Sequence, residues 1–297
     1  MKVPKPPADE SRSPPMSRRE FTALSVAVGI AAVSRSQPAD AAAGVTETDV
    51  EIKTPSGTCD AALVHPSAKG SWPAAIVFPD IFGLRPATRE LARRLAADGY
   101  TVLVPNPFYR LTKAPGITHD FNFDSPEDRA KLAALRAPLT NDGVGQDATA
   151  YVSFLDAQPS VNRKAKVGVF GYCMGGPMTM QAAAAVPGRI GAAASFHGGG
   201  LVSDTPDSPH LLVPKIKARY YFAIAANDDE KQPTAKTALA DAFHAVNRPA
   251  RIEVYEGTLH GWCMKDMPVM GDKPIYNAPQ AERAWGELTA LFRATLV

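Results

Sequence analysis

The sequence predicts an α/β fold in which helices cover both faces of a mostly parallel β-sheet. Short apolar runs of strand length alternate with segments whose apolar residues recur at helical spacing. Strands separated by helices of this length form βαβ units, so neighbouring strands run parallel. The predicted strands are 74–78, 100–104, a run beginning at Val167, 190–196, 219–225 and 250–255, and the predicted helices are 87–98, 145–157, 177–186, 234–246 and 281–296.

Two segments depart from this alternation. Residues 47–53 and 58–65 flank a Pro-Ser-Gly turn and predict a hairpin at the edge of the sheet. Residues 106–142 contain several prolines, scattered aromatic residues and one charged run. Because a long irregular segment is uncommon without a function, we predict that it passes over the carboxyl edge of the sheet and builds part of a substrate site.

The first 43 residues have the layout of a bacterial export signal. Arg18 and Arg19 precede Phe21, as in twin-arginine signals, and a mildly apolar run follows at 22–33. That run is too short to be a permanent membrane anchor. We expect the twin-arginine translocase to export the chain and cleavage to follow Ala41 or Ala43, which leaves one domain at 44–297 in a periplasmic or secreted protein.

Composition and motifs exclude several classes of function. The formal net charge is +2 and no dense basic patch is interleaved with aromatic residues, so we expect no nucleic-acid partner. The three cysteines, Cys59, Cys173 and Cys263, cannot all pair, and we expect three free thiols. The sequence has no phosphate-binding loop, no dinucleotide fingerprint and no second pair of metal ligands, so neither a nucleotide nor a metal is predicted.

The central motif is Gly171-Tyr-Cys-Met-Gly175, between a buried strand and an Ala-rich segment of helical length. This is the nucleophile-elbow pattern of α/β-hydrolases, with Cys173 where serine is usual. A sharp turn from strand to helix strains the backbone at the nucleophile, so Gly171 and Gly175 must be small. The next amide, that of Met174, then points at an incoming carbonyl and contributes to an oxyanion hole.

A nucleophile needs a base, and the base needs a carboxylate that orients it. In α/β-hydrolases these groups follow the nucleophile in chain order, each after a strand. Here Asp228 and Asp229 follow the strand 219–225, and His260 follows the strand 250–255. We predict Asp228 as the acid because it comes first after its strand, and Asp229 remains open.

Further motifs accompany this order. They are Asp80-Ile-Phe-Gly83, the run from Tyr109 to Gly116, and Leu259-His-Gly-Trp262. With the cysteine elbow and Asp228, they resemble the dienelactone hydrolase family over about residues 47–295. The resemblance implies a single-domain α/β-hydrolase fold and hydrolysis of an enol lactone through an acyl-cysteine intermediate, without a cofactor.

The resemblance also implies roles around the thiol. The amide of Ile81 would complete the oxyanion hole, and Asp80 would tune the thiol where the family's type members have glutamate. Tyr109, Arg110 and Trp262 would contact the substrate, with Arg110 matching a carboxylate-binding arginine. A second such arginine is absent after the histidine, where this chain has Lys265. A lysine is a point charge that cannot form the bidentate contact of arginine.

We therefore predict a cysteine hydrolase of a small lactone or ester, with Cys173 as nucleophile and His260 as general base and then acid. Two alternatives stay open: a carboxylesterase of broad specificity, and a non-catalytic small-molecule binder with the same fold. The motif His197-Gly-Gly-Gly200 imitates an oxyanion motif of lipases but follows the nucleophile. We interpret it as a turn at a strand end near the site.

Overall fold

The computed structural model describes residues 44–118, 121–122, 124–267, 269–270 and 273–296. The predicted export signal, with Arg18, Arg19, Ala41 and Ala43, lies outside these residues. No helix in the part that is described is long and apolar enough to cross a membrane.

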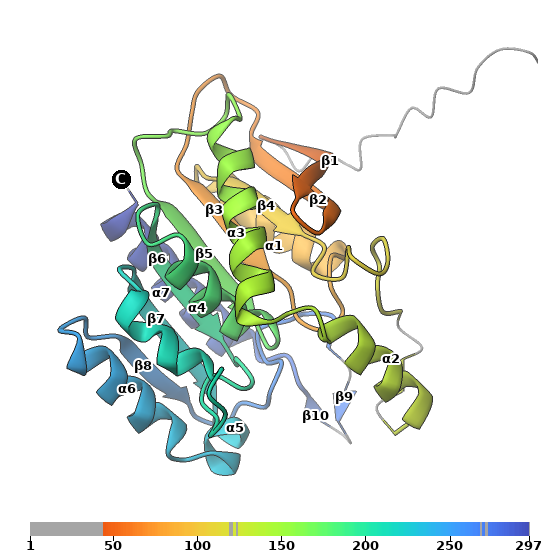
Figure 1. The fold of residues 1–297 in the computed structure, drawn as a ribbon, viewed down its shortest axis with the longest axis vertical. Coiled ribbons are helices and arrows are strands. Elements are labelled where there is room, and N and C mark those ends of the chain that lie inside the picture. The colour runs from red at the N-terminus through yellow and green to blue at the C-terminus, as the bar shows by residue number, and fades with distance from the viewer. Residues whose placement is uncertain (1–43, 119–120, 123, 268, 271–272, 297) are drawn as a thin grey trace, which may run out of the picture. The chain divides into compact units, whose positions relative to one another are not determined.

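The described residues form one sheet of eight strands in the order β1-β2-β4-β3-β5-β6-β7-β8 (Figure 1). The hairpin β1–β2 lies at one edge and pairs with β4 in antiparallel fashion, and all later neighbours are parallel. The predicted α/β-hydrolase fold class is thereby confirmed. The strands are β1 (Val45–Thr54), β2 (Gly57–Pro66), β3 (Ala74–Phe78), β4 (Thr101–Pro105), β5 (Val167–Tyr172), β6 (Ile190–Phe196), β7 (Arg219–Ala225) and β8 (Arg251–Tyr255).

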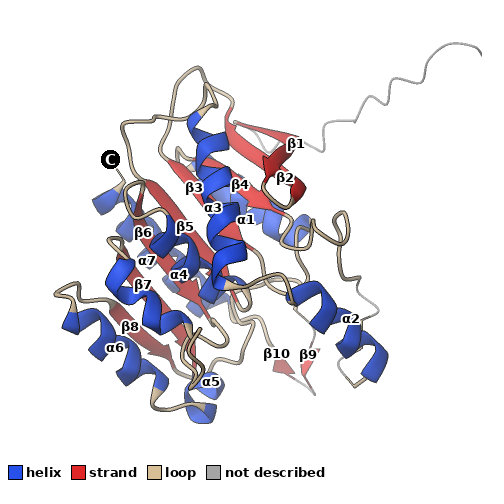
Figure 2. Ribbon diagram, viewed as in Figure 1, coloured by secondary structure: helices blue, strands red, loops and turns tan. Residues whose placement is uncertain are grey.

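Helices cover both faces of this sheet (Figure 2). On one face lie α3 (Asn141–Asp156), α4 (Gly175–Ala185) and α6 (Ala235–Ala245), and on the other lie α1 (Pro86–Ala97) and α7 (Ala278–Thr295). Side chains alternate between the two apolar cores along β5, since Val169 packs in the first and Tyr172 in the second.

The segment 106–142 is less irregular than predicted, because it contains helix α2 (Pro126–Arg136). Ser125 accepts a hydrogen bond from the amide of Asp128, and Pro126 occupies the first turn. These are ordinary helix-start signals. Our interpretation of the prolines as evidence for irregular structure was wrong at this position.

Four further elements were not predicted. A short helix, α5 (Ala226–Lys231), follows β7 directly, and a 3₁₀-helix spans Pro209–Lys215. After β8, which we expected to be the last strand, β9 (Val269–Met270) and β10 (Lys273–Pro274) form a small hairpin. Such short elements bury too little for a periodic pattern to show in the sequence.

Candidate active site

Cys173 lies at the turn between β5 and α4, in a strained backbone conformation. Its φ is +50°, which is uncommon for a residue with a side chain. The turn closes through hydrogen bonds from the Cys173 amide to Phe196 O (3.1 Å) and from the Gly176 amide to Cys173 O (3.0 Å). The strain is therefore held by the surrounding backbone, as is typical of functional sites.

The two glycines of the motif are required by close backbone contacts. A Cβ on Gly171 would lie 2.1 Å from the carbonyl oxygen of Gly175. A Cβ on Gly175 would lie 2.1 Å from the carbonyl oxygen of Phe78, the last residue of β3. The start of α4 thus lies directly against the end of β3, so the loop that carries Ile81 begins beside the elbow.

His260 is held by two neighbouring residues of α5. Its Nδ1 lies 2.6 Å from Asp228 Oδ2, and its backbone amide donates to Asn227 Oδ1 at 2.8 Å. Thr258 Oγ1 adds a link between the strand ends, since it donates to Tyr255 O and accepts from the amide of Ala226. The ends of β7 and β8 therefore fix both the backbone and the ring of His260.

The electrostatics of His260 favour its cation. Burial acts to lower its pKa, but the hydrogen bond with Asp228 and the influence of Cys173 outweigh burial and raise the pKa to about 10. At neutral pH the imidazole is therefore protonated and can serve as a general acid. The side chain stays 30% exposed, so a substrate can reach it.

Between the two candidate aspartates, the geometry favours Asp228. The carboxylate of Asp229 accepts a hydrogen bond from Lys236 Nζ at 2.5 Å and makes no recorded contact with His260 among the described residues. The amides expected to form an oxyanion hole, those of Ile81 and Met174, donate to no recorded acceptor in the described residues. They remain available to a ligand.

Asp80 is paired with an arginine. Its two carboxylate oxygens accept hydrogen bonds from Arg85 at 2.7 and 2.9 Å, and Arg85 also binds Asp266. No hydrogen bond from Asp80 to Cys173 is recorded among the described residues. Burial raises the pKa of Asp80 despite the guanidinium beside it. Asp80 is thus part of a buried ion network that fixes the loop after β3.

Arg110 and Tyr109 are also committed elsewhere. Two nitrogens of Arg110 donate to the carboxylate of Asp147 at 2.8 and 2.9 Å, and the Tyr109 hydroxyl donates to the same group at 2.7 Å. Asp147 is 3% exposed. The bidentate face of Arg110 is therefore occupied, and the predicted contact with a substrate carboxylate would require it to leave a buried partner.

Trp262 is fully buried, which contradicts the predicted contact with substrate. Its ring stacks on Tyr255 at 4.4 Å between centroids. The ring of His260 also contacts His197, edge to face at 4.9 Å between centroids. His197 is itself fully buried, with φ +40° and no recorded partner for either ring nitrogen among the described residues.

A family comparison decides what this geometry belongs to. The profile of the dienelactone hydrolase family matches residues 59–296. The chain belongs to the dienelactone hydrolase family. It is 27% identical to a carboxymethylenebutenolidase of Pseudomonas putida over 72% of this chain and 84% of the relative. It is accordingly an enzyme of the dienelactone hydrolase family.

Solved structures show the same fold at lower identity. A dienelactone hydrolase-like promiscuous phosphotriesterase from metagenomic libraries superposes with a TM-score of 0.69 at 23% identity, covering 86% of this chain and all of the other (100%). Dienelactone hydrolase from Anabaena variabilis gives a TM-score of 0.59 at 18% identity, with 86% and 100% covered.

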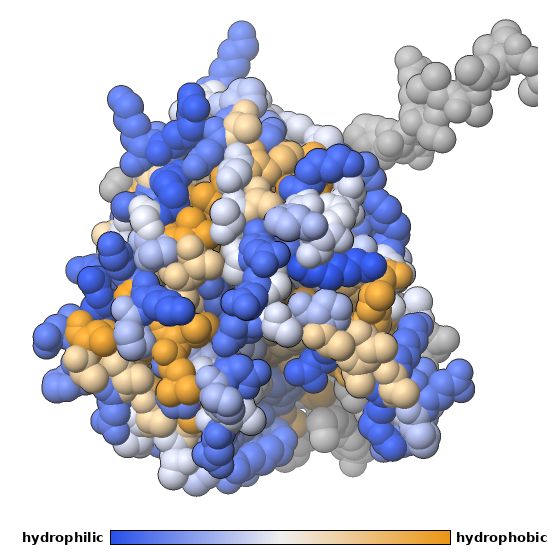
Figure 3. Space-filling model, viewed as in Figure 1, coloured by the Kyte–Doolittle hydropathy of each residue, from blue (hydrophilic) through white to orange (hydrophobic). Residues whose placement is uncertain are grey.

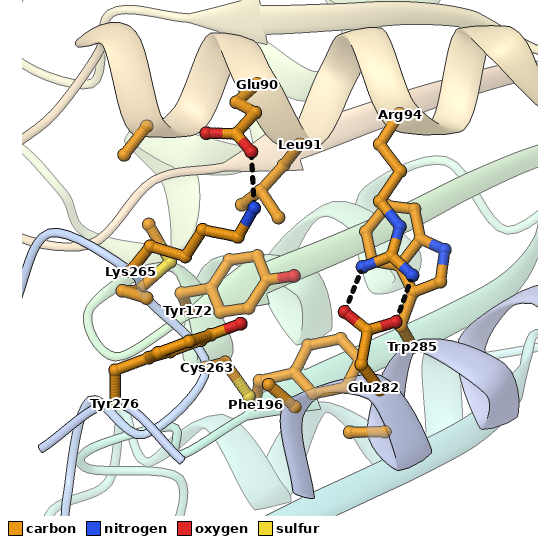
Figure 4. Close-up of a pocket in the computed structure, with 14 residues that line it drawn as sticks. Glu90, Leu91, Arg94, Tyr172, Phe196, Cys263, Lys265, Tyr276, Glu282 and Trp285 are labelled. Carbon is orange, nitrogen blue, oxygen red and sulfur yellow. Dashed lines mark hydrogen bonds and ion pairs between the residues drawn. The ribbon is translucent and has the colours of Figure 1, made fainter. Parts of the chain in front are cut away.

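A small cavity of this dienelactone hydrolase family member lies between α1 and α7, on the face of the sheet that these two helices cover (Figure 4). Tyr172 and Cys263 line it, although they are close in sequence to Cys173 and His260. Burial raises the pKa of the Cys263 thiol well above its ordinary value. Lys265, which we considered as a substitute for a substrate-binding arginine, pairs here with Glu90 at 2.5 Å.

Two further features concern Cys59 and possible metal ligands. Cys59 lies in the core, and burial raises its pKa to about 12. The three cysteines are unpaired. Within the described residues, no group of three or more histidine, cysteine or acidic side chains could hold a metal ion.

Sequence reasoning missed two residues that shape the site, Asn227 and Arg85, whereas His197, which contacts the ring of His260, lies in the turn that the sequence placed near the site. Asn227 directly precedes Asp228, so a polar residue at a strand end offered a signal. The partners of Arg85 and the packing of His197 involve residues far away in the chain, for which one sequence carries no signal.

Proposed function

We propose that the protein hydrolyses a small lactone or ester, of the enol-lactone kind, through an acyl-cysteine intermediate. Cys173 is the nucleophile, His260 moves the proton and Asp228 orients His260. The observation that carries the proposal is the 2.6 Å contact between His260 Nδ1 and Asp228 Oδ2, which joins residues that follow the neighbouring strands β8 and β7 of the sheet whose strand β5 ends directly before Cys173.

In the first half of the reaction, the Cys173 thiolate attacks the carbonyl carbon of the substrate. The carbonyl π electrons move to oxygen, and the amides of Met174 and Ile81 donate to this oxyanion. When the oxyanion collapses, the bond to the leaving oxygen breaks and His260 gives that oxygen its proton. The product is a thioester, and for a lactone the released hydroxyl or enol remains part of the acyl group.

In the second half, neutral His260 removes a proton from a water molecule as the water attacks the thioester carbonyl. The second oxyanion uses the same two amides. Its collapse breaks the carbon–sulfur bond, releases the carboxylic acid and restores the pair of thiolate and imidazolium. Asp228 holds the Nδ1 proton of His260 throughout, so Nε2 faces Cys173 in each step.

The chemistry of the leaving group supports an activated substrate. An enolate departs with little protonation, and the relatives named carboxymethylenebutenolidase support an enol lactone. A carboxylesterase of broad specificity would instead hydrolyse simple aryl esters with equal or higher kcat/KM.

The test is a substrate panel on the purified domain, with a dienelactone and p-nitrophenyl acetate compared for the wild type and Cys173→Ala. We expect Cys173→Ala to abolish turnover and mass spectrometry of the quenched wild type to show an acyl adduct on Cys173. Full activity of Cys173→Ala would refute the mechanism. A Cys173 inert to iodoacetamide at neutral pH, with no turnover of any ester, would favour a non-catalytic binder.

We also propose export by the twin-arginine pathway, which rests on Arg18, Arg19 and Phe21 in the sequence. This pathway carries folded proteins, so the activated thiol would reach its native surroundings before it meets an oxidising compartment. Replacement of Arg18 and Arg19 by lysine should retain the enzyme in the cytoplasm. Unchanged export of that variant would contradict the proposal.

A further inference from the structure

A cleft of about 310 Å³ lies between α2 and α4, beside the nucleophile. Ala133, Ala137 and Leu139 line one side and Met174, Pro177 and Met178 the other, together with the polar residues Arg136 and Gln181. Figure 3 shows apolar surface over the carboxyl half of α2, where this cleft opens. A volume of this size lies at the lower end of the range for small-molecule sites.

The cleft extends to the residue that follows the nucleophile. Met174 lines the cleft and directly follows Cys173. The backbone amide of Met174 is one of the two that we expect to bind the oxyanion. A substrate carbonyl bound at that amide would therefore have one substituent directed along the first turns of α4. Met174 and Met178 are unbranched and adapt to substituents of different shape.

The topology indicates which substituent this is. His260 and Asp228 follow β8 and β7, which lie on one side of β5 in the sheet. The segment that contains α2 follows β4, which lies on the other side of β5 (Figure 1). Because His260 must protonate the leaving oxygen, the leaving group points towards β7 and β8 and the acyl group towards α2.

We propose that the α2–α4 cleft binds the acyl group of the substrate, and that this group is an extended apolar chain or ring. The proposal rests on the function proposed above. It predicts that the preferred esters or lactones have an acyl group larger than that of the smallest substrates on which the mechanism could act.

The two polar residues of the cleft fit this occupant. Arg136 is exposed, and its side chain has no recorded partner among the described residues. Its methylene stem can cover an apolar chain while the guanidinium stays in water. Gln181 Nε2 donates to Asn141 at 2.8 Å, and its buried Oε1 has no recorded partner among the residues described. Neither residue brings a negative charge to the cleft.

The experiment measures kcat/KM for p-nitrophenyl acetate, butyrate and hexanoate, which differ only in the acyl chain. For the wild type we expect a rise of up to about threefold to fourfold for each added methylene, the factor for burying one CH₂ group. The critical variant is Ala133→Trp, which fills the cleft from α2. It should lower the ratio of hexanoate to acetate kcat/KM at least tenfold.

Ala134→Trp is the matched control, because Ala134 is an exposed neighbour on the same helix that does not line the cleft. It should leave the ratio at the wild-type value. Ala137→Phe tests the same wall independently, should Ala133→Trp fail to fold by circular dichroism. A flat chain-length series in the wild type, with turnover still dependent on Cys173, would overturn this inference and leave the proposed function standing. No turnover of any ester would overturn both.

Discussion

On the His260 side of Cys173, the ends of neighbouring strands place the reactive residues, whereas on the α2 side polar residues are held by pairs that distant side chains form. The elbow is fixed by contacts between Gly171, Gly175 and the end of β3, and His260 by the ends of β7 and β8. Across the site, Arg110 and Tyr109 lie in a turn and are positioned by Asp147 of helix α3. Backbone constraints leave local patterns in a sequence, while ion pairs between distant residues do not.

The sharpest test of the elbow geometry is the substitution Gly171→Ala. The added methyl would lie 2.1 Å from a carbonyl oxygen, so we expect loss of soluble protein and of all activity. Gly286→Ala is the control, because nothing lies within 4 Å of its Cβ position in α7. It should raise the free energy of unfolding by roughly 0.5–1 kcal/mol, as for other helix-interior glycines. A stable, active Gly171→Ala would remove the steric account of the elbow.

Asp228→Asn should have the next largest effect. The amide keeps the shape but no longer stabilises the imidazolium, so kcat/KM should fall roughly 100- to 10,000-fold. Asp229→Asn, which removes the partner of Lys236, should change kcat/KM less than about threefold. Steady-state kinetics on both variants decides the assignment, and the reverse order would make Asp229 the acid.

On the α2 side, Arg110→Gln should lower the stability of the protein rather than weaken substrate binding. It leaves the buried Asp147 carboxylate without its cation, which costs about 3 kcal/mol of unfolding free energy. Thermal or urea denaturation measures this loss. Adding Asp147→Asn should recover part of it. Normal stability with a raised KM for a carboxylate-bearing lactone would restore the substrate contact that the sequence predicted.

The pH dependence separates the charge of His260 from its position. Because the pKa is raised to about 10 in the folded protein, the imidazolium persists through neutral pH. Its stabilising contribution is complete below the ordinary histidine value and is lost as the pH rises through about 10. We expect kcat/KM to decline on the alkaline side near that value, and the decline to move to lower pH in Asp228→Asn. An identical alkaline limb in both proteins would contradict the charge assignment.

The smallest effect is expected for Lys265→Gln. Lys265 and its partner Glu90 are each more than half exposed, at 56% and 52%. Exposed pairs contribute up to about 1 kcal/mol. Stability should change within that limit, and KM for acidic and neutral esters should stay equal to the wild type. A selective rise in KM for acidic esters would bring Lys265 into the site.

The same contrast explains what the sequence could predict. The strands β3, β6 and β7 have the predicted bounds, because each is a short apolar run buried on both faces. The positions of Cys173, Asp228 and His260 followed from the order of strand ends. The partners of Arg110, Asp80 and Trp262 could not be predicted, because each depends on packing between segments far apart in the chain. Helix α2 could have been predicted from Ser125 and Pro126, whose helix-start signals were available in the sequence.

The ion network around Arg85 has a consequence for exchanging parts between relatives. Arg85 binds Asp80 in the loop after β3 and Asp266 in the loop after His260, so one guanidinium joins the two loops that carry Ile81 and the catalytic base. A chimera that receives only one of these loops from another family member would inherit half of this junction. The two loops should therefore be transplanted as a unit, and a shuffled library should return active recombinants mainly where both come from one parent.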